Sequence, residues 1–574
     1  MTDRLASNSS TSSQSPSTTQ SPTSSRVSGI VIVGGIGALL AAALLAYFAY
    51  AATVVDVPDY GGTYIEGTLG PPASLVPMLA NDQTARTLSG LIFNGLTRFA
   101  ADGTIVPDLA TRWEIDPQSR SYVFHLREGV RWHDGTPFTV DDVLFTYALL
   151  ASPTRNDPVW SNVRAEREGN RSVRIFLLNN VYVPLLEYAM IGILPQHLLE
   201  GVSADQILLT PFNLAPVGTG PYRVEEVTEE FALLRANEDY FGGLPRIRFL
   251  KFKFYPNAGA TITALERGEV EGVSYLPPAE IDRVREIADV ETYSASLAGY
   301  TVLYFNLRRP PFFDRRVRHA IAHAIDREYL AEEVQGGIAD PLEGPILPVS
   351  QVHSADVVRY PYDPARSRSL LEETGWIAGP DGVRKKGEEL LELTLLATDL
   401  PGHAELAEAI SEQLEEVGFE VDIQFAGPSG LLNDFLLTHE FDIALYTWLL
   451  NGLEPDPYLT WHSSQIEGWN FSGFIDPRVD EALQNARNTL DQNERKRMYV
   501  DFQRAFAEEV PSLMLLSPRY SFAVRTTVRG VTVPTVLPTV DSRLSEIGSW
   551  YIKTKKNVLN VRGPLEGWRI PFFS

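Results

Sequence analysis

Four segments decide the fold class: LELTLLAT (391–398), LAEAISEQLEEVG (406–418), FEVDIQFA (419–426) and FDIALYTW (441–448). In the first and third segments apolar residues alternate with polar ones, which is the period of a half-buried strand. In the second segment apolar residues recur every three or four positions, as on one face of a helix, and Gly418 ends that helix. A short apolar helix is expected at 431–437. Strands that alternate with helices predict an α/β lobe with a largely parallel sheet and right-handed crossovers.

Local signals earlier in the chain also indicate mixed structure. Residues 121–126 (SYVFHL) predict a strand. Thr139, with Asp142 three residues later, resembles a capping box and predicts a helix that continues to about Leu150. The sequence VGTGPY at 217–222 is rich in glycine, but no lysine follows it. We therefore expect a crossing between lobes there and not a phosphate-binding loop.

The polar loop after the last strand, LNGLEPDP (450–457), is the best candidate site. Ligands of open α/β sheets tend to lie beyond the carboxyl ends of the strands. Aromatic side chains offer a large contact area, and neighbouring carboxylates and amides can orient a ligand. The alternative is a set of core aromatics beside a solvated acidic turn. The predicted ligand-binding residues are Tyr304, Asn306, Tyr446, Trp448, Asn451, Glu454, Asp456 and Trp461.

Length and composition narrow the possible classes of protein. A chain of 574 residues exceeds what one hydrophobic core supports, so at least two lobes are expected. Its 73 acidic and 49 basic side chains give a net charge of −24, which argues against nucleic-acid binding. The chain has no cysteine, so disulfides, thiolate metal sites and a lipid-modified cysteine are excluded. Residues 1–28 are mostly Ser, Thr, Pro and Gln, which predicts a disordered tail.

Residues 29–51 contain no charged side chain and are long enough to cross a hydrocarbon layer of about 30 Å. Arg26 precedes this segment, while Asp56 and Asp59 follow it. The positive-inside rule then places the N-terminus in the cytoplasm and the main body outside, as a single-pass protein of the cell membrane. The competing interpretation is a signal peptide cleaved after Ala51, although its apolar core would be unusually long.

Several catalytic motifs are missing from the sequence. It contains no P-loop, so any energy from ATP must come from a partner protein, and it has no H-E-x-x-H or G-x-S-x-G motif. His319 and His323 stand four residues apart on a predicted helix, but two histidines supply only half of a usual metal site. Glu454 and Asp456 could in principle act as a hydrolytic carboxylate pair. We expect no catalytic residue, no metal ligand and no cofactor.

Five blocks of sequence resemble one protein family, in the order that the family has them. They are LATRWEIDPQSRSYVFHLREGVRWHDGTPFTVDDVLFTYALL from Leu109, VGTGPYRVEE from Val217, YFNLRRPPFFDRRVRHAIAHAID from Tyr304, YDPARSRSLLEETGW from Tyr362 and FDIALYTWLLNGLEPDP from Phe441. The family is that of the family 5 extracellular solute-binding proteins, the dipeptide, oligopeptide and nickel receptors of ABC importers. The resemblance covers about residues 61–556.

The resemblance implies a two-lobed fold like that of periplasmic binding proteins, which closes on its ligand about hinge strands near 300–307 and 511–519. It also implies ABC permease subunits with their ATPases as partners, and a peptide or other small solute as ligand. The expected parts are domain I (60–93, 213–302 and 511–556), domain II (94–212), domain III (303–510) and a C-terminal extension (557–574).

One position departs from the peptide-binding members of that family. They carry an aspartate three residues after the tryptophan that matches Trp448, and it pairs with the terminal amine of the peptide. Here that position is Asn451, which brings no countercharge, and Glu454 or Asp456 is the candidate replacement. The alternatives are a nickel or metal-chelate receptor, a tethered hydrolase and a sensor. Nickel has little support, because only His462 lies near the candidate loop.

Overall fold

The computed structural model describes residues 36–37, 39–45, 47–48, 54–155, 157, 159–178, 184–400, 402–450 and 452–558. Within these ranges no helix has both the length and the apolar character needed to cross a membrane. The predicted tail at 1–28 and most of the C-terminal extension lie outside the described residues, as does part of the apolar segment 29–51.

The described residues fall into two compact units. The smaller one joins the ends of the chain, where strand β1 (Val54–Asp59) and strand β24 (Lys553–Val558) form a two-stranded sheet. The larger unit comprises residues 59–553 and holds every predicted site residue that the structure describes.

The predicted α/β lobe is confirmed. Strand β19 (Glu392–Thr398) pairs in parallel with β20 (Glu420–Ala426) and with β21 (Ile443–Leu449), and helix α12 (His403–Glu416) connects the first two. The short helix expected before β21 is present, but it is a π-helical segment, η7 (Leu431–Leu436). Local periodicity therefore gave the right elements in this lobe.

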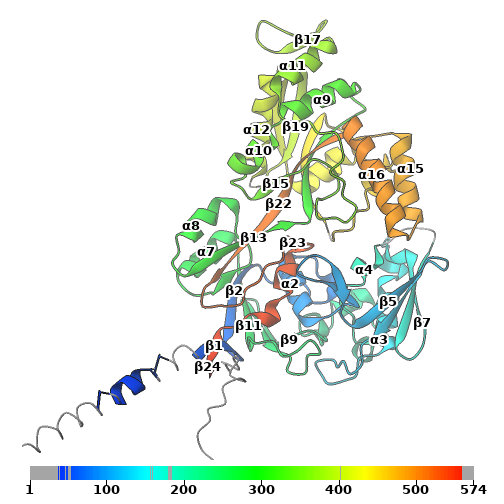
Figure 1. The fold of residues 1–574 in the computed structure, drawn as a ribbon. Coiled ribbons are helices and arrows are strands. Elements are labelled where there is room, and N and C mark those ends of the chain that lie inside the picture. The colour runs from blue at the N-terminus through cyan, green and yellow to red at the C-terminus, as the bar shows by residue number, and fades with distance from the viewer. Residues whose placement is uncertain are drawn as a thin grey trace, which may run out of the picture. The chain divides into compact units, whose positions relative to one another are not determined.

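These strands belong to a much larger sheet, in which β22 (Ser512–Arg525) connects two halves. The first part of β22 pairs with β14 (Gly299–Phe305), which in turn pairs with β21. Its second part pairs with β13 (Val290–Leu297). Figure 1 shows β22 in orange, running from the region of β2 up to the region of β19. The same strand thus passes through both halves of the larger unit.

The remaining strands of this sheet lie mostly in the second half. They are β2 (Thr63–Leu69), β9 (Tyr222–Val227), β10 (Phe231–Ala236), β11 (Phe249–Tyr255), β12 (Gly272–Val273), β15 (Ala339–Pro341) and β23 (Val536–Leu537). Strand β14 is buried along its whole length, and its successive residues alternate between two hydrophobic clusters. A strand buried on both faces reads as a continuous apolar run, as YTVLYF (300–305) does.

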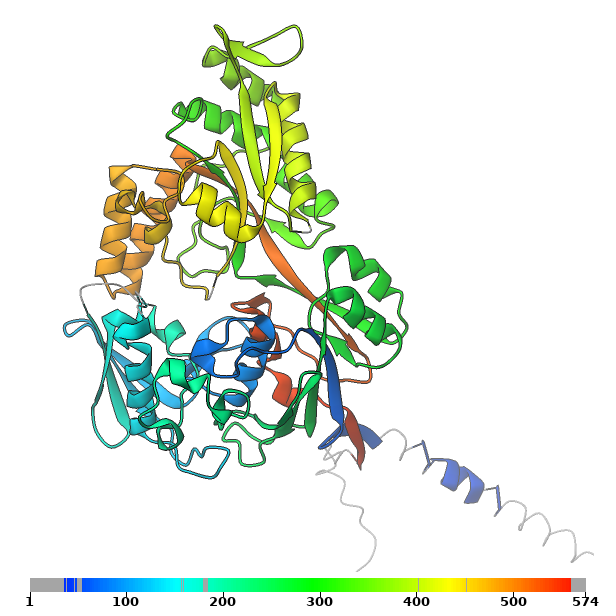
Figure 2. The same cartoon turned by 180° about the vertical axis from the view of Figure 1, so that it is seen from behind.

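Helices cover both faces of the first half. Helices α9 (Arg315–Ala324) and α12 pack on one face, while α16 (Gln492–Glu509) and α15 (Pro477–Asn488) pack on the other. Figure 2 shows these layers from behind. His319 and His323 on α9 contact the carbonyl oxygens of Glu508 and Pro361, each at 2.8 Å. Each of these two imidazole rings is thus in contact with a backbone carbonyl.

A separate four-stranded antiparallel sheet has the order β5 (Ala110–Asp116), β6 (Ser121–Leu126), β8 (Ser172–Leu177) and β7 (Val163–Arg167). The strand predicted at 121–126 is therefore correct. The helix predicted after Thr139 is α3 (Val140–Leu150), and the Thr139 N–H donates to the carboxylate of Asp142 at 2.8 Å. One hydrophobic cluster joins this sheet to β2, β10 and β11, so these two regions share a core.

The other short strands and helices complete the fold. They are β3 (Thr97–Phe99), β4 (Ile105–Pro107), β16 (Ile377–Ala378), β17 (Arg384–Lys386), β18 (Glu389–Leu390), α2 (Gln83–Ile92), α4 (Leu185–Tyr188), α5 (Gln196–Leu199), α6 (Ala204–Ile207), α7 (Ala258–Glu266), α8 (Ile281–Arg285), α10 (Arg327–Tyr329), η6 (Leu330–Val334), α11 (Pro364–Glu373), α13 (Pro428–Gly430) and α14 (Tyr458–Trp461).

The segment 217–222 is fastened to the turn that follows β6. The Gly218 N–H donates to Nδ1 of His133 at 3.2 Å, and Nε2 of His133 donates to the Gly220 carbonyl at 3.0 Å. Only a neutral imidazole can accept at one nitrogen and donate at the other. Burial lowers the pKa of His133 to about 4, in keeping with this arrangement. His133 therefore fixes the position of segment 217–222, which leads from the region of the four-stranded sheet into the large sheet.

The two hydrogen bonds of the neutral His133 ring predict a loss of stability in acid. Below the ordinary histidine pKa of about 6.5 the unfolded chain takes up a proton, whereas folded His133 does so only near its pKa of about 4. The His133 contribution is therefore complete above pH 6.5 and falls as the pH drops to about 4. Between pH 7 and pH 5 the wild type should lose roughly 2 kcal/mol more unfolding free energy than His133→Phe, measured by urea titration. Equal losses in the two proteins would contradict this assignment.

Candidate functional site

An aromatic group surrounds the end of β21. The Trp448 ring lies 4.8 Å from that of Tyr446 and 5.3 Å from that of Trp469, centre to centre. The Trp448 Nε1–H donates to the Tyr304 hydroxyl at 2.9 Å. Trp448 and Tyr446 are half-buried, and Trp469 is 46% exposed. Parts of these three rings are therefore available to a ligand.

Two predicted site aromatics lie beneath this exposed layer. Tyr304 is fully buried and Trp461 is 1% exposed, and their ring centres are 6.0 Å apart. Phe471 lies edge-on to Tyr304 and stacks on Trp448. Because a buried ring fixes the position of its neighbours, Tyr304 orients Trp448 from below, and Trp461 in turn packs against Tyr304. The structure thus brings four of the predicted residues, Tyr304, Tyr446, Trp448 and Trp461, into one group.

Asn306 lies just beyond the end of β14, and its side chain forms hydrogen bonds with backbone groups. Its amide nitrogen donates to the carbonyls of His439 at 2.9 Å and Phe441 at 2.8 Å, and its amide oxygen accepts from the Arg308 N–H. The residue is 1% exposed. In this arrangement Asn306 fixes the start of the segment that leads into β21.

The two predicted carboxylates hold the loop after β21 against the helices of the same lobe. Glu454 forms an ion pair with Arg495 of α16 at 2.9 Å. Asp456 accepts from Nε of Arg487 of α15 at 3.0 Å. Both side chains therefore have a structural use, which weakens the case for a hydrolytic pair. Asn451 lies outside the described residues.

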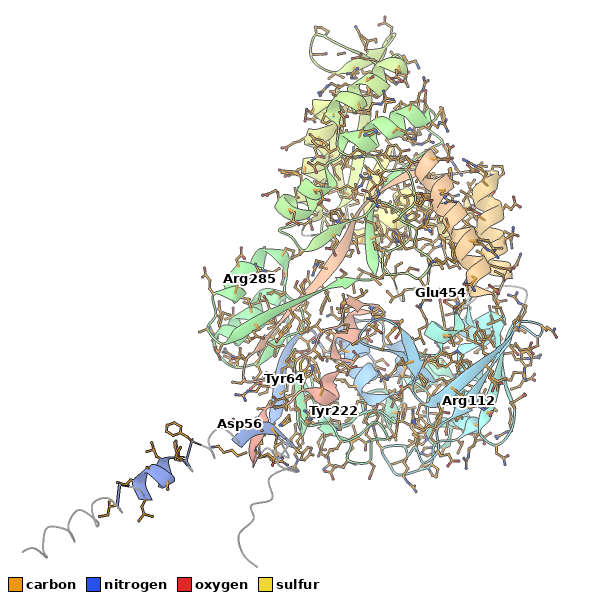
Figure 3. All side chains as sticks on the ribbon, in the orientation of Figure 1. Asp56, Tyr64, Arg112, Tyr222, Arg285 and Glu454 are labelled. Atoms are coloured by element: carbon orange, nitrogen blue, oxygen red, sulfur yellow. The ribbon has the colours of Figure 1, made fainter. Side chains whose placement is uncertain are left out.

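One residue of this region was missed in the sequence analysis. Glu187 of α4 accepts backbone N–H bonds from Leu453 and Glu454, each at 2.9 Å. Burial raises the pKa of Glu187 to about 7; the two backbone N–H bonds oppose this rise, and the negative charge of Glu454 adds to it. Its signal in the sequence is a single carboxylate within the apolar run PLLEYAMIGIL (184–194). Figure 3 labels Glu454 beside the end of α16, where that end approaches the cyan region of the chain.

The described part of the chain contains no group of three His, Cys, Asp or Glu side chains placed to hold a metal ion. His462 accepts from the Ser464 N–H at 3.0 Å, and its ring stacks on that of Tyr458. The protein groups near the loop are thus aromatic rings, paired carboxylates and backbone amides, which suit non-covalent binding of a small solute.

The family model of bacterial extracellular solute-binding proteins, family 5 (middle), matches residues 104–469. The chain belongs to this family. The match includes the aromatic group, the loop after β21 and most of the first half of the large sheet. The expectation drawn from the five sequence blocks is therefore confirmed.

Relatives of this family 5 protein include the oligopeptide-binding protein AppA of Bacillus subtilis, 26% identical over 82% of this chain and 89% of AppA. The dipeptide-binding protein of Escherichia coli is 25% identical over 81% of this chain and 91% of its own. NikZ of Campylobacter jejuni, solved with Ni(L-His), is 27% identical, with a TM-score of 0.70 over 85% of this chain and 99% of NikZ. These likenesses confirm the mixed α/β fold of periplasmic binding proteins.

Proposed function

We propose that this protein is the receptor of an ABC importer, which captures peptides or peptide-like solutes between two closing lobes and performs no chemistry on them. The family match over residues 104–469 carries the proposal, and relatives named as oligopeptide- and dipeptide-binding proteins favour a peptide ligand. Permease subunits receive the solute, and their ATPases supply the energy. A metal chelate of the kind bound to NikZ is the second candidate ligand.

The lobes that we propose follow the sheets and cores. Domain I (60–93, 213–302 and 511–556) and domain II (94–212) form one lobe, because their sheets share a hydrophobic cluster. Domain III (303–510) forms the other lobe, with its own clusters on the two faces of its sheet. Strands β14 and β22 run between the lobes and are the proposed hinge. Closure about such strands shifts the open and closed populations according to the ligand's preference for the closed form.

The N-terminal apolar segment is the proposed attachment to the membrane. Residues 29–51 would span the bilayer once, with the tail in the cytoplasm and the binding lobes outside, in keeping with a family of extracellular proteins. The receptor would then stay close to its permease without a lipid anchor. The sequence has no cysteine to which such a lipid could be attached.

In the proposed site, Tyr446, Trp448 and Asn451 face the ligand, while Tyr304 and Trp461 support them. Glu454 and Asp456 hold the loop through their arginine partners. The half-buried Trp448 offers the ligand its ring, and its indole N–H is already used by Tyr304. Stacking on this ring is the main contact that we assign to the aromatic group.

Replacing Trp448 by alanine should weaken peptide binding by about 1–3 kcal/mol, which is roughly 5- to 150-fold in Kd. Isothermal titration calorimetry with a peptide recovered from the protein provides the measurement. Trp448→Phe is the matched control, because it keeps an aromatic face and loses only the donor to Tyr304, so its loss should be smaller. An unchanged affinity in Trp448→Ala would place the ligand elsewhere.

A further inference from the structure

The loop that carries the candidate site is held from the opposite lobe by Glu187. One carboxylate oxygen of Glu187 accepts the N–H groups of Leu453 and Glu454, each at 2.9 Å. Gly452, just before them, permits the approach, because a Cβ there would lie 1.8 Å from the other oxygen of Glu187. Three consecutive residues directly after Asn451 are therefore shaped by a side chain far upstream in the sequence.

The other fasteners of this loop come from the loop's own lobe. Arg495 pairs with Glu454, Arg487 pairs with Asp456, and the Tyr499 hydroxyl donates to the Pro455 carbonyl at 3.0 Å. These contacts persist whether the lobes are open or closed, because helices α15 and α16 move with the loop. Of these four side chains, Glu187 alone belongs to the other lobe, so its bonds depend on closure.

The lobes also meet at two other points in this region. Leu453 approaches Gly103, where a Cβ would lie 3.0 Å from the leucine Cδ1. Nη1 of Arg120 donates to the Asn488 carbonyl at 3.0 Å. Beside it opens a surface cavity of about 540 Å³, lined by residues of the β5–β6 turn and of the α15–α16 turn. An interface with a cavity beside its contacts suits two parts that separate and rejoin.

We propose that Glu187 is a positioning residue, a latch that sets the shape of the binding loop only when the two lobes close. When the lobes close, Glu187 on the lobe that holds domain II forms its two backbone bonds and so stabilises the loop that bears Asn451. This inference rests on the proposed closing motion. It assigns no ligand contact to Glu187, which acts through the backbone of residues 453 and 454.

The charges around the latch make closure sensitive to pH. Glu454, which pairs with Arg495, faces Glu187 from the loop. From the lobe of Glu187, Tyr122 lies near Glu454, and Tyr188 lies near both Glu187 and Asp456, which pairs with Arg487. With its two backbone bonds formed, as in this structure, Glu187 has a pKa of about 7, whereas an exposed glutamate has a pKa of about 4.3. At a pH between these two pKa values, closure is therefore accompanied by the uptake of a proton. The closed form becomes less favoured as the pH rises toward and past 7.

Single-molecule fluorescence energy transfer can test the latch on the full chain. The sequence has no cysteine, so dyes can be attached at Asp205→Cys on α6 and Glu412→Cys on α12, two exposed positions on opposite lobes. In the ligand-free protein, the ratio of closed to open molecules should fall about tenfold from pH 6 to pH 8. Glu187→Gln keeps an acceptor oxygen without the charge, so its ratio should change less than twofold over this range.

Glu187→Ala removes the acceptor and should lower the closed population several-fold at pH 6. Glu200→Gln, an exposed glutamate of the same lobe, is the matched control and should behave as the wild type. A tryptic casein hydrolysate tests the closing motion itself. If the hydrolysate closes the lobes while Glu187→Ala has no effect, or Glu187→Gln keeps the pH dependence, the latch is wrong and the proposed function stands. A single population that ignores the hydrolysate would overturn both.

Discussion

Replacing Gly218 by alanine should destabilise the protein by about 4 kcal/mol, or prevent folding altogether. A Cβ at Gly218 would lie 1.9 Å from the carbonyl oxygen of Ile92. That oxygen already accepts the Gly220 N–H at 2.8 Å, and the Gly218 carbonyl accepts the His133 N–H at 2.9 Å. Since backbone lies on both sides, the clash can be relieved only by breaking the bonds that hold the segment 217–222 to the end of α2 and to the turn after β6.

Urea unfolding of Gly218→Ala, compared with Gly344→Ala, gives the measurement. A Cβ at Gly344 would meet no atom within 4 Å, and that residue is only partly buried, so its variant should stay within about 0.5 kcal/mol of the wild type. Similar stability for the two variants would show that the crossing at 217–222 is not tightly packed.

Replacing Arg543 by methionine should cost about 3–5 kcal/mol, because it leaves the buried carboxylate of Glu66 without its countercharge. Both residues are fully buried. Nη1 of Arg543 donates to Glu66 at 3.0 Å, and the Tyr64 hydroxyl donates to the same oxygen at 2.8 Å. Glu66 lies on β2 and Arg543 on a short helix, η9 (Val540–Leu544), so the pair holds the segment after β22 against the large sheet.

A matched control is the exposed pair of Arg283 and Glu266, which forms two hydrogen bonds of 2.8 and 2.9 Å. Solvent screens this pair, so Arg283→Met should cost less than about 1 kcal/mol. Chemical denaturation of both variants measures the contrast. The joint variant of Glu66→Leu with Arg543→Met should recover part of the loss, because no unpaired charge remains buried. A cost for Arg543→Met as small as that of the control would refute a structural role for the buried pair.

Features governed by neighbouring residues were predictable from the sequence. The α/β unit at 391–448, the strand at 121–126 and the cap at Thr139 all depend on spacings of two to four residues, which a sequence displays directly. Burial was harder to predict. Phe425 completes the alternating pattern of β20, yet it is 48% exposed, because β20 is an edge strand.

Pairings between strands that lie far apart in the sequence could not be predicted from it. That β22 would pass through both halves of the sheet depends on partners hundreds of residues away, and no local period reports them. The same reason limits what the sequence indicates of the candidate site. Tyr446 and Trp448 stand at the end of a strand that the sequence predicts, whereas the backbone contacts of Asn306 and the two bonds of Glu187 depend on segments brought together by folding.

The central claim is that two lobes enclose a peptide and release it unchanged. Native mass spectrometry of the full chain, incubated with a tryptic casein hydrolysate, tests this claim most directly. The account predicts complexes heavier than the protein by discrete peptide masses, and the same peptides recovered intact after denaturation. Protein without bound mass, or hydrolysate peptides cleaved during the incubation, would contradict it.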